Sequence, residues 1–244
     1  MKTIAVFRAV TLNWLRSRSG LFFSFVFPVL LLLLLGSLSA GSSSGFLSQG
    51  PGFYLPGLVA AFIMTNGVIG LTNVASELKR SGVLRRLAST PLTRLDWILG
   101  NMLSQVVLGG SLAAVMLLLG FAVYGVPIPL SPFLIPLVIA GSLMFSGLGM
   151  VLAGIVSDPE TASGLGNGVA FPMMLLAGTF WTLESMPGYL QALSKVLPLT
   201  YLTDGLRQAA ASDLSGATVD LAVVLAFTAA FVLLGSAFTR WTAR

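Results

Sequence analysis

Two long stretches without a charged residue constrain this chain more than any other feature. No Asp, Glu, Lys or Arg occurs between Arg18 and Glu77, a run of 58 residues, or between Asp96 and Asp158, a run of 61 residues. A transmembrane helix needs about 20 apolar residues to cross the hydrocarbon core of a bilayer, so each run is long enough for two spans. Two shorter charge-free runs can each hold one span: 161–183 and 221–239. We therefore predict an all-α integral membrane protein with six transmembrane helices.

The chain is expected to form a single membrane domain over residues 1–244. Its expected segments are an interfacial helix (1–20), spans one and two (21–75), a charged loop (76–97), spans three and four (98–156), span five (164–183), an external re-entrant helical segment (184–216) and span six (220–240). Pro28, Pro136 and Pro172 are expected to bend the helices that contain them, because proline disrupts helical hydrogen bonding.

The N-terminal segment has the spacing of an amphipathic helix. Between Lys2 and Arg18, apolar residues at positions 6, 7, 10 and 14 fall on one arc, and polar residues at positions 8, 13 and 16 fall on another. This pattern favours a helix that lies on the membrane surface with its arginines towards lipid phosphates. The alternative is an irregular basic tail.

The basic residues predict the orientation of the chain. Eleven of the 13 Lys and Arg residues flank the spans on the side that carries both termini and the 76–97 loop. Cytoplasmic segments of membrane proteins carry such an excess of Lys and Arg. We therefore expect both termini on the cytoplasmic side of the cell membrane, with membrane lipids as neighbours, and no nucleic-acid partner for the net charge of +5.

Several absences narrow the function. The chain has no Cys and no His, and no apolar run contains an ionisable side chain. This argues against proton relays, charged ion pores and intramembrane hydrolases. None of Lys2, Lys79 and Lys195 follows a glycine, so the chain has no P-loop. We expect no catalytic residue, metal or cofactor in this chain, and any energy for transport to come from another subunit.

The charged loop carries the most distinctive local pattern. Gly82 permits a sharp turn, and Pro91 suits the first position of a helix with Thr90 as its N-cap. Between them, Val83, Leu84, Leu87 and Ala88 form one face of a short helix, with Arg85 and Arg86 on the other. The spacing alone fits two hypotheses equally well: a basic loop that enforces topology, or a helix that docks into a soluble partner.

Three sequence motifs resemble those of type-2 ABC exporter permeases. Residues 81–92 (SGVLRRLASTPL) resemble the cytoplasmic loop of that family, which often reads G-[IV]-L-[KR]-R-L-x-x-T-P-L. Residues 148–167 with 175–181 resemble the region of its fourth and fifth spans, and residues 197–207 (LPLTYLTDGLR) resemble its external ending. The motifs occur in the family's order and cover nearly the whole chain.

The resemblance implies the membrane-spanning permease subunit of an ATP-driven exporter. Such a subunit pairs with a second permease, as a homodimer or heterodimer, and with two copies of a separate ATP-binding subunit that hold ATP and Mg²⁺. The charged loop is then the coupling helix. By this resemblance, the residues that couple to the ATPase are Glu77, Arg80, Gly82, Leu84, Arg85, Arg86, Leu87, Thr90 and Pro91.

Polar residues inside the spans are candidates for a substrate path. Asn66 and Asn73 are seven residues apart, as are Thr65 and Thr72, so each pair is expected to share a helix face. Asn167 lies in the fifth span, which the resemblance places beside the cavity with spans one and two. The alternative is that these residues only form hydrogen bonds between helices. In the fifth span, a GxxxG pattern at 164–168 favours close helix packing.

The external segment is expected to form two short helices. By resemblance it is an extracellular gate that includes Tyr201, Asp204 and Arg207. The last two residues are expected to form either a weak surface pair or an anchor to a neighbouring segment.

The leading hypothesis is an ABC exporter permease. The Leu-, Phe- and Met-rich spans suit an amphipathic or lipid-like substrate. The alternatives are an ATP-independent pore or facilitator, and a membrane scaffold without transport.

Overall fold

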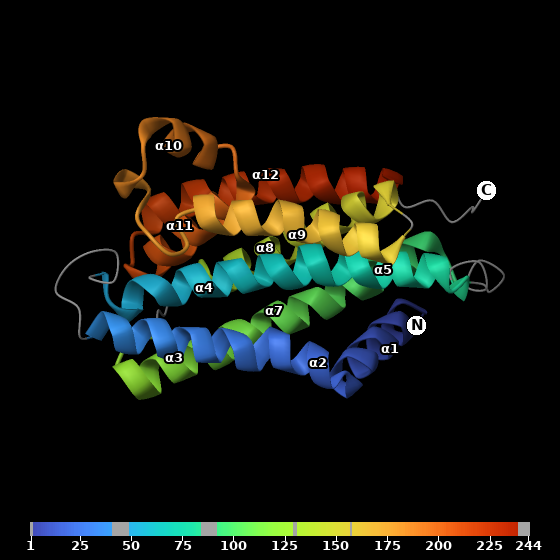
Figure 1. Cartoon of the computed structure of the whole chain (residues 1–244), viewed down its shortest axis with the longest axis horizontal. Helices are drawn as coiled ribbons and strands as arrows, with labels where there is room; N and C mark the ends of the chain where they lie inside the picture. The colour runs from blue at the N-terminus through green and yellow to red at the C-terminus, as the bar shows by residue number, and fades with distance from the viewer. Residues whose placement is uncertain (1, 41–48, 84–91, 129–130, 157, 239–244) are drawn as a thin grey trace.

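The computed structural model describes residues 2–40, 49–83, 92–128, 131–156 and 158–238, and the long helices lie side by side along the long axis of the molecule (Figure 1). The regular elements in these ranges are all helical, which confirms the predicted all-α class. Five helices are long and apolar enough to cross a membrane: Arg18–Ser39, Pro51–Arg80, Leu95–Tyr124, Leu134–Ile155 and Leu214–Phe238.

The first two spans both contain a π-helical turn. The first consists of α2 (Arg18–Leu21), η1 (Phe22–Val26) and α3 (Phe27–Ala40). The second consists of α4 (Pro51–Thr65), η3 (Asn66–Gly70) and α5 (Leu71–Arg80). Every residue from Tyr54 to Met64 is buried, so the second span forms the centre of the bundle. π turns are rare and often occur at functional sites.

A helical hairpin follows, formed by α7 (Arg94–Tyr124) and α8 (Leu134–Ile155). The N-cap of α7 is Thr93: its hydroxyl accepts the Asp96 backbone N–H, and the Asp96 carboxylate accepts the Thr93 N–H. Thr90, the predicted N-cap, lies outside the described residues. This reciprocal capping box stabilises a helix start. Gly125 ends α7 with a φ of 66°, a left-handed conformation that glycine adopts without strain.

Pro136 lies within the first turn of α8, which begins at Leu134. The first N–H groups of a helix have no partner inside it, so a proline here removes no helical hydrogen bond. Its place gives no hydrogen-bonding reason for Pro136 to bend its helix. Pro172, by contrast, lies in the interior of α9, and Pro28 is the second residue of α3, which follows the π turn η1.

The predicted fifth span has different bounds in the structure. α9 covers Pro159–Leu176 and is not among the five candidate spans of the described residues. Its start is set by Asp158, whose carboxylate accepts the Thr161 N–H and whose pKa is lowered mainly by that bond. The chain turns at Gly178, whose φ is 74°.

The segment predicted to form two short helices does so, after a single 3₁₀ turn, η4 (Leu183–Ser185). These helices are α10 (Gly188–Ser194) and α11 (Pro198–Ala210). The last helix, α12 (Leu214–Phe238), begins six residues before the predicted start of the sixth span. It therefore contains Asp220, which is only 8% exposed, so this span includes an ionisable group although the charge-free run 221–239 does not.

The N-terminal helix α1 (Lys2–Arg16) packs on α7. The Thr3 hydroxyl donates to the Asp96 carboxylate at 2.7 Å, the Ser104 hydroxyl donates to the Phe7 carbonyl at 3.3 Å, and Val6 lies against Gly100. Val6, from the apolar arc of this helix, therefore contacts protein. In Figure 1, α1 and the end of α5 lie at one end of the bundle, which we call the α1 end. The helices α10 and α11 lie at the opposite end, which we call the α11 end.

Candidate functional site

A cavity of about 740 Å³ lies between the first span, the second span and α9. None of its lining residues is charged. Pockets of about 300–1,000 Å³ are typical of sites that hold a drug-sized molecule. The space is therefore large enough for a substrate, and its lining suits a neutral or amphipathic one.

Polar side chains from all three walls face this cavity. Four of the five predicted path residues line it, together with three serines of the N-terminal segment and first span. These polar residues are Ser17, Ser19, Ser24, Thr65, Asn66, Asn73 and Asn167. Two of the amides already have partners, since the Ser24 hydroxyl donates to Asn66 Oδ1 at 2.7 Å and Asn167 Nδ2 donates to the Ser163 carbonyl at 2.8 Å.

Thr72, the fifth predicted path residue, does not line this cavity. It is fully buried, and its hydroxyl donates to the carbonyl of Val68 in its own helix and to that of Gly149 in α8. The prediction that Thr65 and Thr72 share a face is wrong, since Thr65 lines the cavity and Thr72 packs on α8. Asn66 and Asn73 both remain at the cavity, and the Oδ1 atom of Asn73 is buried without a hydrogen-bond partner among the described residues.

Aromatic rings form much of the remaining lining. They are Trp14, Phe23, Phe27, Phe62 and Phe171. Phe23 on the first span and Phe171 on α9 are 63% and 56% exposed, so the cavity is open between these two walls. The described residues leave this apolar rim exposed.

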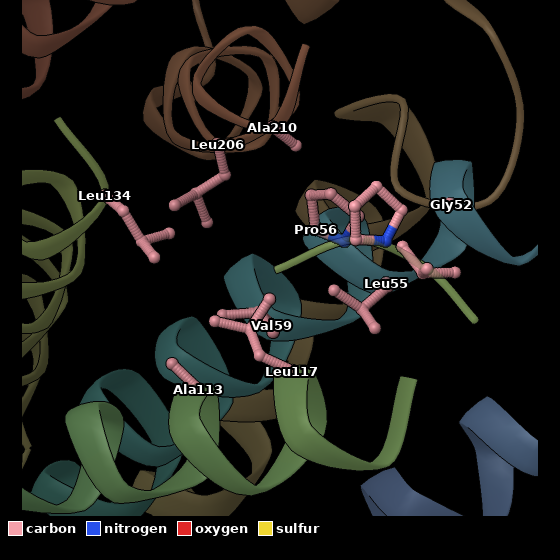
Figure 2. A pocket seen from close by; sticks show the side chains of 11 residues that line it. Gly52, Leu55, Pro56, Val59, Ala113, Leu117, Leu134, Leu206 and Ala210 are labelled. Atoms are coloured by element: carbon pink, nitrogen blue, oxygen red, sulfur yellow. The ribbon is translucent and has the colours of Figure 1, made fainter. Parts of the chain in front are cut away.

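A second pocket lies at the α11 end, between α4, α7 and α11 (Figure 2). It holds only about 20 Å³ and is lined by apolar residues such as Leu55, Val59 and Leu206. That volume is close to the minimum for one water molecule, and an apolar void of this size stays dry. This pocket therefore cannot hold a substrate.

The predicted coupling residues are only partly described. Glu77 and Arg80 are exposed on the last turns of α5, and Gly82 has a φ of 70°, as expected for a sharp turn. The other predicted coupling residues lie outside the described residues: Leu84, Arg85, Arg86, Leu87, Thr90 and Pro91.

Lys79 carries a contact that the sequence pattern did not indicate. Its ammonium donates to the carbonyls of Ala153 and Val156, at the C-terminal end of α8. The last carbonyls of a helix lack partners inside it, and a cation there is favoured by the helix dipole. Lys79 thus joins the helix that leads into the charged loop to the end of α8.

The three predicted gate residues lie on α11, and Arg207 is largely buried. Its guanidinium donates to the carbonyls of Gly178 at 2.6 Å, Thr179 at 3.3 Å and Phe53 at 3.4 Å. It also stacks on the Phe53 ring at 3.7 Å, a cation–π geometry. Burial lowers the pKa of Arg207 to about 10.

Asp204 lies 3.7 Å from the Arg207 guanidinium. Burial raises the pKa of the Asp204 carboxyl, and the charge of Arg207 opposes that shift. Tyr201 donates its hydroxyl to the Lys195 carbonyl at 2.7 Å. The description of Asp204 and Arg207 as a surface pair is wrong, and the alternative that they anchor the segment to its neighbours agrees with these contacts.

Comparison with known proteins identifies the family. The model of the ABC-2 type transporter family matches residues 1–210, most of the chain. The chain belongs to the ABC-2 type transporter family. It is thus related to ABC transporter permeases, and its apolar helices make it a multi-pass membrane protein.

Three curated ABC-2 relatives show the breadth of the similarity. The daunorubicin resistance ABC transporter permease protein DrrB1 of Streptomyces coeruleorubidus is 27% identical over 74% of this chain. The probable multidrug ABC transporter permease YbhR of Escherichia coli K12 is 30% identical over 67% of it, and the linearmycin resistance permease protein LnrN of Bacillus subtilis 168 is 25% identical over 62%. The matched parts make up 65%, 45% and 39% of these relatives' lengths.

Proposed function

We propose that this chain is the permease subunit of an ATP-driven exporter and that the cavity between the first span, the second span and α9 is its substrate path. The observation that carries the proposal is the uncharged cavity of about 740 Å³, with amide and aromatic side chains on its walls. Three of the relatives are named for multidrug, daunorubicin or linearmycin permeases. A neutral or amphipathic, drug-like substrate suits both the uncharged cavity and the substrates in these relatives' names.

The energy for export comes from a separate ATP-binding subunit in this proposal. Two copies of it hold ATP and Mg²⁺ and bind the charged loop at the α1 end. Support comes from the exposed Glu77 and Arg80, from the sharp turn at Gly82, and from the absence of a P-loop in the sequence. Lys79 then transmits movement of the loop to α8, because its ammonium joins the two helices.

A second permease subunit completes the path. The open side of the cavity exposes Phe23 and Phe171, and large apolar side chains exposed together mark interaction surfaces or lipid contacts. A partner permease, identical or homologous, covers this rim and turns the two half-cavities into one enclosed route. The Arg207 contacts close the route at the α11 end until the exporter opens outward.

The proposal is tested by reconstituting the permease into liposomes with and without its ATP-binding subunit. Export of amphipathic dyes should require both that subunit and hydrolysable ATP. The double change Arg85→Glu/Arg86→Glu should weaken binding of the ATP-binding subunit and abolish export without lowering the thermal stability of the permease. Dye flux that persists without ATP would instead identify an ATP-independent pore.

A further inference from the structure

One hydrogen bond joins the two π turns across the wall of the cavity. Ser24 lies in η1 and Asn66 begins η3, and among the described residues these two segments are the π-helical ones. The Ser24 hydroxyl donates to Asn66 Oδ1 at 2.7 Å, although the residues are 42 positions apart in sequence. Ser24 is only 6% exposed, so water does not compete strongly for this bond.

The direction of this bond fixes which end of the Asn66 amide is free. An Asn side chain has an acceptor oxygen and an NH₂ group that donates twice. Ser24 occupies the oxygen, and the structure shows no hydrogen bond from Asn66 Nδ2 to any residue it describes. The Nδ2 group of Asn66 therefore provides a hydrogen-bond donor to a molecule in the cavity.

The other polar side chains of the second span and α9 in the cavity form different contacts. Asn167 spends an N–H on the Ser163 carbonyl of its own helix, and the Oδ1 of Asn73 is buried without a partner among the described residues. The Thr65 hydroxyl donates to the Ala61 carbonyl. Asn66 is thus the amide whose orientation is set by a side chain from another wall of the cavity.

We infer that Ser24 is a positioning residue that sets the substrate preference of the cavity. Its hydroxyl holds Asn66 Oδ1 and so presents Asn66 Nδ2 to the ligand. The cavity therefore selects molecules that carry a hydrogen-bond acceptor, such as a carbonyl or ether oxygen, on an apolar ring system. This inference rests on the proposed substrate path. A ligand acceptor forms a hydrogen bond with the Asn66 N–H. A ligand donor at the same place would leave its own N–H and that of Asn66 facing each other without partners, and a buried donor without a partner costs binding free energy.

Two flat tricyclic probes of similar size test this selection directly. 9-Fluorenone carries a carbonyl acceptor, and carbazole carries an N–H donor in the corresponding place. Binding of each is measured by equilibrium dialysis on the full-length permease in detergent, with empty micelles as the blank. The measured quantity is the ratio of the fluorenone affinity to the carbazole affinity.

Ser24→Ala should lower that ratio by about 2- to 10-fold, the equivalent of one neutral hydrogen bond, because the Asn66 amide can then rotate and offer either end. Ser24→Thr keeps the hydroxyl and should retain the wild-type ratio. Ser39→Ala is the matched control, because Ser39 lies in the same span, is also 6% exposed, and donates only to Gly36 in its own helix. It should leave the ratio unchanged.

The outcomes separate this inference from the proposed function. If wild type binds both probes and Ser24→Ala leaves the ratio unchanged, or lowers both affinities equally, the positioning role of Ser24 is overturned while the cavity remains a binding site. If wild type binds neither probe, the cavity assignment fails and the inference fails with it. A lowered ratio in Ser24→Ala that Ser24→Thr restores supports the inference.

Discussion

The guanidinium of Arg207 joins three segments that are distant in sequence. It binds the carbonyls of Gly178 and Thr179 after α9 and that of Phe53 at the start of α4, from its own place on α11. Only the planar five-donor fork of an arginine can reach these groups and stack on the Phe53 ring at the same time. Gly57 permits this approach, because a Cβ there would lie 2.6 Å from the Thr179 carbonyl oxygen.

Arg207→Lys should therefore destabilise the protein, by about 1.5–3 kcal/mol, because an ammonium cannot keep all of these charged hydrogen bonds. The measurement is thermal unfolding of the purified permease in one detergent. Arg80→Lys is the matched control, since Arg80 is exposed on the last turn of α5, and it should change stability little. Equal effects of the two changes would contradict the anchoring role of Arg207.

The sequence predicts the asparagines that line the cavity but not their hydrogen-bond partners. The seven-residue spacing brings Asn66 and Asn73 to one cavity, and the resemblance adds Asn167. Ser24 gave no comparable signal, because its partner lies 42 residues away and π turns have no recognisable sequence pattern. The same seven-residue spacing failed for Thr72, whose hydroxyl bonds the Gly149 carbonyl of α8 and does not face the cavity. The burial of Arg207 depends on tertiary contacts that spacing cannot reveal.

At the scale of the elements, glycines allow the central helices to approach backbone to backbone. Gly67 in the π turn η3 faces α8, where a Cβ would lie 2.9 Å from the Phe145 carbonyl carbon. A Cβ at Gly149 in α8 would lie closer still to the Gly67 carbonyl oxygen in η3. By contrast, a Cβ at Gly164 or Gly168, the predicted GxxxG pair, would meet nothing within 4 Å. The close packing within the described chain uses Gly67 and Gly149, and not that pair.

Gly149→Ala is expected to lower the free energy of unfolding by about 1–3 kcal/mol, the usual cost of overpacking, because the new methyl group meets the fixed backbone of Gly67 and Val68. Gly168→Ala is the control, since it also replaces a glycine inside a helix but has open space around it. That variant should be neutral or slightly more stable, because alanine favours helix over glycine. The account of this packing fails if both variants melt at the wild-type temperature.

The helix boundaries show where sequence patterns stop being informative. Charge-free runs place the hydrophobic centres of the spans well, but helices continue past them wherever a cap is available. α7 starts at the Thr93 and Asp96 capping box, and α9 starts at the Asp158 cap, five residues before the predicted fifth span. α12 begins six residues before Asp220, because a charged residue can be part of a helix and so does not mark its start.

At the scale of the whole molecule, the two ends of the bundle differ in charge and in construction. The α1 end carries the basic helix α1 and the last turns of α5 with Lys79 and Arg80. The α11 end carries the two short helices α10 and α11, and Arg207 joins α11 to the start of α4 and to the turn after α9. Such asymmetry fits a permease that meets a soluble ATPase at one end and opens outward at the other.

Because the natural chain has no cysteine, single cysteines can test which end faces the cytoplasm. Ser81 and Ser185 are both exposed and lie towards opposite ends of the bundle. In intact cells, a membrane-impermeant maleimide should label Ser185→Cys, and it should label Ser81→Cys only after permeabilisation, because basic segments remain cytoplasmic. The reverse labelling pattern would invert the proposed orientation.

The most direct test of the central claim is obstruction of the cavity in the reconstituted transporter. Asn66→Trp places a bulky ring in the proposed path, whereas Leu118→Trp adds the same ring at a position on α7 that is 59% exposed and does not line the cavity. ATP-dependent export of neutral fluorescent amphiphiles and ATP hydrolysis are measured together in proteoliposomes that contain the ATP-binding subunit. The account predicts that Asn66→Trp abolishes export while basal ATP hydrolysis continues, and that Leu118→Trp transports like wild type. Undiminished export by a stable Asn66→Trp variant would contradict it.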